Sequence, residues 1–457
     1  MTATENTADR STPAGFAAWW MVAVLFVLNI LSMLDRLILT MLVGPIKADL
    51  LISDFQMSLI LGPAFAVFYA LFGVPIGWAV DRYSRRLIIF CGVTLWALST
   101  VASGFARSYE TLLFFRICVG IGEAALAPAA VSLIADAFPK DRVTTALSVF
   151  QSAAKIGAAF AMAAGGLAIA FAGVVMAEHG SLFEFSQPWH LVMAMVGAPG
   201  IVIALLVFTF REPARTAVKK ASALSTGDLL AFLRQRWQLW VGMFVAFNCI
   251  SILGFALSGW MPTYFDRQFG WTPVQYGPGL SLTNIASAVS LVINGWIIDR
   301  LYRRGMRDIH LRFYTWLIIA ISPAFLLIFY IQDPALVLIC YALIQFVTVP
   351  FFVFVSAVIV MVAPGQARGQ LAALYFASFT VLGQGVGPTL VGAITDYGFG
   401  DEAMLGRSLA IVTLTGIAIA FAALQFSLRH VGAAIKDAEA ETREVGGAGG
   451  AETPATA

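Results

Sequence analysis

Five charged residues lie inside long apolar stretches of the sequence. Asp35 and Arg36 are adjacent, Arg116 and Glu123 are seven positions apart, and Lys155 follows farther along the chain. A charge at the centre of a bilayer costs about 2.5–3.5 kcal/mol or more, which makes a functional role the default interpretation. Because carboxyl groups take up and release protons, we expect proton coupling at Asp35 and Glu123. The cations Arg36, Arg116 and Lys155 are expected to form a charge network that binds a substrate headgroup.

Helical geometry limits which of these charges can meet. Neighbours on an α-helix point about 100° apart, so Asp35 and Arg36 need not pair with each other. Arg116 and Glu123 lie two turns apart on one helical face, so both can face the same cavity. Apolar surroundings favour a neutral carboxyl, whereas a nearby guanidinium favours the carboxylate. Glu123 is therefore the expected protonation switch, and Asp35 should stay ionised if it lies near Arg116; the alternative is a structural ion network.

Composition indicates which elements carry these residues. Of the 457 residues, 60% are hydrophobic and 12% are charged, about half the charge of a soluble domain. The apolar runs are too long for the strands of a β-barrel, which have about 10 residues of alternating pattern. The net charge of +2 provides no basic field for nucleic acid. No zinc-protease, nucleophile-elbow or Cys/His cluster pattern occurs, so we expect no enzyme, no cofactor and no metal site.

Twelve apolar runs are long enough to cross a bilayer. The sequence thus predicts an all-α polytopic membrane protein with 12 transmembrane helices in two pseudo-symmetric six-helix bundles. The expected parts are a disordered N-terminus (1–16), an N-terminal bundle (17–210), a cytoplasmic linker (211–237), a C-terminal bundle (238–428) and a disordered tail (429–457). With both termini in the cytoplasm, 21 of the 28 basic residues fall on the cytoplasmic side and four in the outer loops. That orientation obeys the positive-inside rule and suits a bacterial inner membrane.

A ten-residue motif occurs in both halves of the chain. The segments 77–86 and 295–304 share six identical positions, including an Asp-Arg pair and a closing Arg-Arg pair. This Gly-x-x-x-Asp-Arg-x-x-Arg-Arg loop in a twelve-span chain resembles the signature loop of the major facilitator superfamily. The resemblance implies that the loops latch helices on the cytoplasmic side; the alternative is retention of positive charge alone. The expected gating residues are Asp81, Arg82, Arg85, Arg86, Asp299, Arg300, Arg303 and Arg304.

Three further stretches resemble one branch of that superfamily. They are Asn29 with Asp35-Arg36, the segment 52–54 (Ile-Ser-Asp), and the segment 116–124 followed by Asp136. Together they are similar to the Spinster branch of sphingolipid and lysophospholipid transporters. The resemblance implies proton coupling and headgroup handling at Asp35, Arg36, Arg116 and Glu123.

The expected function is proton-coupled secondary transport by alternating access. The expected substrate is an amphiphile of lysophospholipid or sphingoid type, and the expected partners are protons and membrane lipids. The second half carries no deep charge; its aromatic residues, such as Phe351 and Phe354, offer an apolar wall or simply pack helices. Organic anion/proton symport, multidrug/proton antiport and a ligand-sensing membrane receptor remain alternatives. We expect a monomer.

Overall fold

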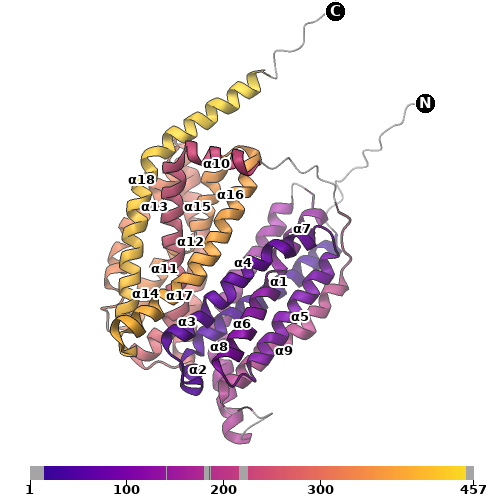
Figure 1. The fold of residues 1–457 in the computed structure, drawn as a ribbon, viewed down its shortest axis with the longest axis vertical. Helices are drawn as coiled ribbons and strands as arrows, with labels where there is room; N and C mark the ends of the chain where they lie inside the picture. Colours follow the sequence, from indigo (N-terminus) through magenta and orange to yellow (C-terminus); the bar gives the residue numbers. More distant parts are fainter. Residues whose placement is uncertain (1–14, 140–141, 180–184, 186, 216–224, 449–457) are drawn as a thin grey trace, which may run out of the picture. The chain divides into compact units, whose positions relative to one another are not determined.

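The computed structural model describes residues 15–139, 142–179, 185, 187–215 and 225–448. Helices make up nearly all of this part of the chain, and it contains no strand. Twelve helical segments are long and apolar enough to cross a membrane, which confirms the predicted all-α polytopic fold. Figure 1 shows these helices running side by side within each half of the chain.

The first half contains six spans, several of which consist of two consecutive helices. The short helix α2 (Val43–Leu50) follows the first span, at the end opposite the N-terminus. The spans are α1 (Phe16–Met41), α3 (Asp54–Leu61) with α4 (Pro63–Val80), α5 (Arg85–Ser103), α6 (Tyr109–Glu123) with α7 (Leu126–Ala137), α8 (Val143–His179), and α9 (Pro188–Ala204) with the 3-10 turn η2 (Leu205–Thr209).

The second half contains the other six spans, preceded by α10 (Thr226–Gln235) in the linker. The spans are α11 (Trp237–Phe269), α12 (Pro273–Arg303), α13 (Ile309–Leu327), α14 (Pro334–Thr348) with α15 (Phe351–Val362), α16 (Gly365–Ser378) with η3 (Phe379–Val386), α17 (Gly387–Ala393) and η4 (Ile394–Phe399), and, after η5 (Glu402–Met404), α18 (Leu405–Ala448). The segments η3 and η4 are π-helical. Helix α18 continues past Arg429, where the sequence predicted the start of a disordered tail. The expectation of disorder at residues 1–14 and 449–457 falls outside the described residues.

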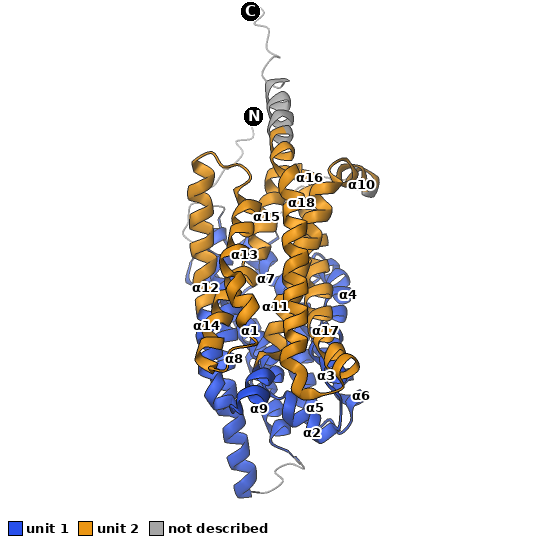
Figure 2. Cartoon of the chain, turned by 90° about the vertical axis from the view of Figure 1, so that its left-hand side faces the viewer, with its two compact units in different colours: residues 1–218, 262–285 blue, residues 219–261, 286–457 orange. Residues whose placement is uncertain are grey.

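The chain forms two compact units that do not coincide with the two halves of the sequence (Figure 2). Unit 1 contains residues 1–218 and 262–285, and unit 2 contains residues 219–261 and 286–457. The end of α11 and the start of α12 therefore pack with the first half. A Cβ on Gly166 would lie only 2.5 Å from the carbonyl oxygen of Pro273, so only glycine permits this approach of α8 to α12.

Local sequence signals set the breaks within the spans. Ser53 begins α3 with a capping box: its Oγ accepts the backbone N–H of Gln56, whose side chain accepts the N–H of Ser53. Gly62 and Pro63 then separate α3 from α4, because proline lacks an N–H and is suited to the first turn of a new helix. Ser84 and Ser108 cap α5 and α6 through their side-chain oxygens, which accept the backbone N–H groups of Leu87 and Thr111.

Small residues bring the helices that carry the deep charges close together. A Cβ on Gly122 of α6 would lie 2.6 Å from the carbonyl oxygen of Gly92 on α5. A Cβ on Gly157 of α8 would lie 3.0 Å from the Cα atom of Ile30 on α1. These contacts fix α1 and α6 in one bundle with α5 and α8, and they position the site described next.

Candidate functional site

Four of the five deep charges lie on two helices of unit 1. Asp35 and Arg36 belong to α1, and Arg116 and Glu123 belong to α6. Asp35, Arg116 and Glu123 are no more than 3% exposed. The Arg36 side chain is the most accessible of the four, at 24%. The structure therefore brings these four predicted residues together, and it pairs them between the helices rather than along either one.

Glu123 is firmly held by α1. Its Oε2 atom accepts hydrogen bonds from Arg36 Nε and Ser32 Oγ, each at 2.6 Å, and Arg36 Nη2 also lies 2.6 Å away. The Arg36 guanidinium lies over the rings of Phe65 and Tyr69 on α4, with its Cζ atom 4.3 and 5.3 Å from their centroids. Charge-assisted bonds of this length stabilise the carboxylate form and fix the orientation of both side chains.

Asp35 is held more loosely. Its Oδ1 atom accepts a hydrogen bond from Thr100 Oγ1 of α5 at 2.7 Å. Its Oδ2 atom lies 3.8 Å from Arg116 Nη1, within ion-pair range but too far for a hydrogen bond. Neither Asp35 Oδ2 nor Arg116 Nε and Nη1 makes any hydrogen bond, although all three atoms are buried. This pair therefore retains capacity to bind a proton at the acid and an anion at the base.

The two pairs are reciprocal, because each helix supplies one acid and one arginine. Their four formal charges sum to zero, so a proton on either carboxyl leaves one arginine without its counter-charge. That arginine then attracts an anionic group, and loss of the proton reverses the effect. The arrangement can thus couple protonation to anion binding between the same two helices.

Lys155 is not brought into this cluster. It lies two positions before Gly157 on α8, and so points about 200° around the helix from the glycine that packs against α1. Within the part of the chain that the structure describes, it makes no hydrogen bond or ion pair. Lys155 is half-buried and stands as a separate cation.

Sequence reasoning missed the hydroxyl groups that hold the two carboxylates. Ser32 and Thr100 are 3% and 0% exposed, and each donates to one acid of the cluster. Serine and threonine occur throughout the spans, so their residue type carries no signal. Ser32 lies one helical turn before Arg36, and this spacing is the only feature that could have indicated it.

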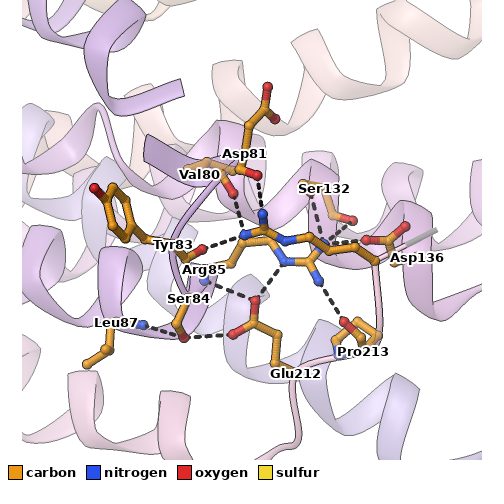
Figure 3. A network of polar contacts seen from close by, with 11 residues as sticks. Val80, Asp81, Tyr83, Ser84, Arg85, Leu87, Ser132, Asp136, Glu212 and Pro213 are labelled. Carbon is orange, nitrogen blue, oxygen red and sulfur yellow. Dashed lines mark hydrogen bonds and ion pairs between the residues drawn. The ribbon is translucent and has the colours of Figure 1, made fainter. Parts of the chain in front are cut away.

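At the loop between α4 and α5, Arg85 is the centre of a buried network (Figure 3). Its side chain is 1% exposed, and its Nε donates to Glu212 Oε1 at 3.0 Å. Its terminal nitrogens donate to Asp136, to Ser132 Oγ at 3.0 Å and to the carbonyl oxygen of Pro213 at 2.7 Å. This one side chain therefore ties the start of α5 to the end of α7 and to the segment after η2.

The other expected gating residues of this loop make more local contacts. Arg86 Nη1 donates to the carbonyl oxygen of Phe210 at 2.6 Å. Arg82 lies over the ring of Trp78, with its Cζ atom 4.0 Å from the centroid. Asp81 is exposed, and its backbone carbonyl accepts a hydrogen bond from Arg215.

Glu212 and Arg215 are two further residues that sequence reasoning did not single out. Arg215 donates to three backbone carbonyls at the end of α4 and just beyond it. Burial alone would raise the pKa of Glu212, but hydrogen bonds from Ser84 and Arg85 outweigh it and hold the pKa below its ordinary value. The charged run after the sixth span is the sequence signal that could have indicated both residues.

The matching loop of the second half does not repeat this network. Arg300 lies over Trp296 at 5.4 Å, as Arg82 lies over Trp78. Arg303, the counterpart of Arg85, is exposed and donates only to the backbone carbonyl of Asp299 at 3.2 Å. Arg304 and the Asp299 side chain are also exposed. The two loops therefore share the contact between arginine and tryptophan, and only the first loop has the buried ion network around Arg85.

Unit 2 contains an apolar cavity bordered by α10, α11, α15 and α16. Two polar atoms in its lining, Trp240 Nε1 and Tyr375 Oη, are buried without a hydrogen-bond partner. The remaining lining residues are apolar: Leu233, Met243, Phe244, Val355, Ile359, Leu371 and Leu374. The phenylalanines proposed as an apolar wall pack elsewhere in the unit; Phe354, at 2% exposed, stacks on Phe313 and meets Tyr314 edge to face.

The chain is similar in sequence and in structure to known proteins. The family model of the Major Facilitator Superfamily matches residues 25–388. An MFS-type efflux pump of Mycolicibacterium smegmatis is 29% identical over 89% of this chain and 91% of its own length. Protein spinster homolog 1 of Xenopus tropicalis is 30% identical over 54% of this chain and 45% of its own length.

Among solved structures, a bacterial homolog of the human lysosomal transporter Spinster superposes with a TM-score of 0.72. It shares 21% sequence identity, over 93% of this chain and 97% of that one. The predicted resemblance is confirmed: the chain belongs to the Major Facilitator Superfamily and is similar to its Spinster members.

Proposed function

We propose that this transporter couples proton movement to the movement of an amphiphile with an anionic headgroup. The observation that carries the proposal is the unequal bonding of the two acid–arginine pairs. Glu123 receives charge-assisted hydrogen bonds from Arg36, whereas Asp35 and Arg116 face each other without one. The loosely bonded pair has the chemistry needed to exchange a proton for an anion.

In the proposed cycle, a proton from water binds Asp35 and cancels its charge. Arg116 is then released from its counter-ion and binds the anionic headgroup of the substrate. Loss of the proton to water on the other side restores the attraction between Asp35 and Arg116, which displaces the headgroup. This assignment reverses the one proposed from sequence, because Glu123 rather than Asp35 is the acid held by charged donors.

Two other features support an amphiphilic anion as the substrate. Counting Lys155, the five deep side chains carry three positive and two negative charges, and this excess of positive charge favours an anionic substrate over a cationic one. The buried Nε and Nη1 atoms of Arg116 have no hydrogen-bond acceptor, and an anionic headgroup would supply one. Sphingoid phosphates and lysophospholipids with an anionic headgroup are amphiphiles that carry such a group.

Reconstitution into sealed vesicles with an imposed pH gradient tests the proposal. Three probes are compared: a lysophospholipid, a sphingoid phosphate and a small organic acid. We expect gradient-dependent movement of an amphiphile. Movement of the organic acid alone would replace lipid transport by anion symport, and binding without flux would favour a receptor.

Multidrug/proton antiport is the second candidate. The similarity to an efflux pump over nearly the whole chain favours it. A cationic amphiphile distinguishes the two, because Arg116 and Lys155 should repel it.

We also propose that the protein is a monomer in the bacterial inner membrane, with both termini in the cytoplasm.

A further inference from the structure

Thr100 is a buried hydroxyl at the charged cluster that neither charge nor motif would single out. It lies on α5, is 0% exposed, and donates its hydroxyl proton to Asp35 Oδ1 at 2.7 Å. Helix α5 contributes no charged group to the cluster. Thr100 is therefore the one described residue of α5 whose side chain is hydrogen-bonded to Asp35.

The hydrogen bond makes the two oxygens of the Asp35 carboxyl unequal. Oδ1 is occupied by Thr100, whereas Oδ2 accepts no hydrogen bond and faces Arg116 Nη1 at 3.8 Å. A proton that bound Oδ1 would weaken the Thr100 bond, because the hydroxyl oxygen of a neutral acid accepts a hydrogen bond less strongly than a carboxylate oxygen does. A proton that binds Oδ2 leaves the Thr100 bond in place and stands between the acid and its arginine.

We propose that Thr100 is a positioning residue that directs proton binding to Asp35 Oδ2 and sets the pH at which it occurs. The inference rests on the proposed function, in which Asp35 carries the proton. Hydronium in the water supplies the proton: its O–H bond breaks and leaves water as the O–H bond at Oδ2 forms, and release to water reverses this exchange with no change in electron count. The Thr100 bond persists in both states, and it is stronger to the carboxylate than to the neutral acid.

The charged groups that act on Asp35 are Arg116 and Glu123 from α6 and Arg36 from α1. A change at Thr100 leaves all three in place. Removal of the hydroxyl donor destabilises the carboxylate form of Asp35 more than the neutral form. Protonation of Asp35 should therefore occur at higher pH. Loss of one such donor corresponds to about one pH unit, or roughly tenfold in proton affinity.

The matched control lies on the same helix. Thr94 is also on α5, and its Oγ1 atom is buried without a hydrogen-bond partner. Thr100→Val and Thr94→Val thus make the same change of side chain, and only the first removes a bond to the cluster. Thr100→Ser keeps the hydroxyl and should restore the wild-type behaviour.

The experiment follows the infrared C=O band of the protonated Asp35 carboxyl in purified, reconstituted protein as pH is varied; Asp35→Asn identifies the band. The pH profile of vesicle transport is recorded in parallel. We expect the midpoint of the band to rise by about one pH unit in Thr100→Val and to stay unchanged in Thr94→Val and Thr100→Ser. Equal midpoints in wild type and Thr100→Val, equal shifts in both valine variants, or no titrating band assigned to Asp35 would overturn the inference.

The two proposals fail in different ways. A band that titrates and shifts as expected, in a protein whose transport ignores the pH gradient, would overturn proton-coupled transport and retain the role of Thr100. Gradient-dependent transport that is lost in Asp35→Asn, combined with an unshifted band in Thr100→Val, would support proton-coupled transport and overturn the role of Thr100.

Discussion

Arg267 donates two hydrogen bonds to Asp54, from Nη1 to Oδ2 at 2.7 Å and from Nη2 to Oδ1 at 2.8 Å, although 213 positions separate them. Asp54 is the first residue of α3 and is 0% exposed, and Arg267 lies near the end of α11. Lys47 of α2 is a second cation bound to the same carboxylate. All three belong to unit 1, so this ion cluster anchors a segment of the second half of the sequence to helices of the first.

We expect Lys47 and Arg267 to differ in what they anchor. Arg267→Met should speed amide hydrogen exchange in residues 262–285, lowering the free energy of local opening by about 1–3 kcal/mol. The cost stays below that of an unpaired buried charge because Lys47 still neutralises Asp54. Lys47→Met removes the cation of α2 and should leave exchange in 262–285 unchanged. Equal effects of the two variants on that segment would contradict the division of roles.

The internal repeat provides a matched pair of arginines, Arg85 and Arg303, for testing the Arg85 network. Arg85→Met leaves the acids Asp136 and Glu212 without their shared donor in a buried setting, so we expect a loss of about 3–5 kcal/mol in stability. Arg303→Met changes the same motif position where the side chain is exposed, and should stay within about 0.5 kcal/mol of wild type. Thermal unfolding in detergent measures both. Similar losses in the two variants would contradict a special role for the buried network.

Glu212 makes the stability of this network depend on pH. Because its pKa in the folded protein is depressed, its contribution is fully present above the ordinary pKa of glutamate and is lost as pH falls through the folded value. We therefore expect Glu212→Gln to melt at a lower temperature than wild type near neutral pH. The two melting temperatures should converge as pH falls below the ordinary glutamate pKa and through the lower folded pKa, where the carboxyl becomes protonated in wild type as well. A gap that stays constant into acid would rule out this carboxylate as its cause.

The sequence predicts the fold more completely than the site. Apolar run length and the 21-to-4 distribution of basic residues depend on each segment alone, so twelve spans follow without knowledge of packing. The meeting of α1 and α6 charges also follows, because ionisable residues at bilayer depth must find one another or a polar cavity. Which acid pairs with which arginine depends on the rotation of two helices, and no residue pattern fixes that rotation.

The two loops mark where sequence repetition is a poor guide to structure. Identical motifs end α4 and α12, yet Arg85 is buried and Arg303 is exposed. The difference lies outside the motif. Asp136, at the end of α7, and Glu212, after η2, accept from Arg85, whereas Arg303 donates to a backbone carbonyl of its own helix. A motif therefore predicts a buried arginine only where distant acids are present to receive it.

The unequal bonding of the two pairs distinguishes Asp35→Asn from Glu123→Gln. We expect Asp35→Asn to abolish the dependence of transport on a pH gradient, because it removes the acid that no arginine holds by a hydrogen bond. Glu123→Gln should retain that dependence and instead destabilise the protein by about 1–3 kcal/mol, since Arg36 loses the acceptor of its charge-assisted bonds. Flux with and without the gradient, and thermal unfolding of the same preparations, separate the two effects. Loss of gradient dependence in Glu123→Gln alone would identify Glu123, not Asp35, as the residue that binds the coupled proton. Apolar surroundings would then have to favour the neutral form of Glu123 more strongly than its two contacts with Arg36 favour the carboxylate.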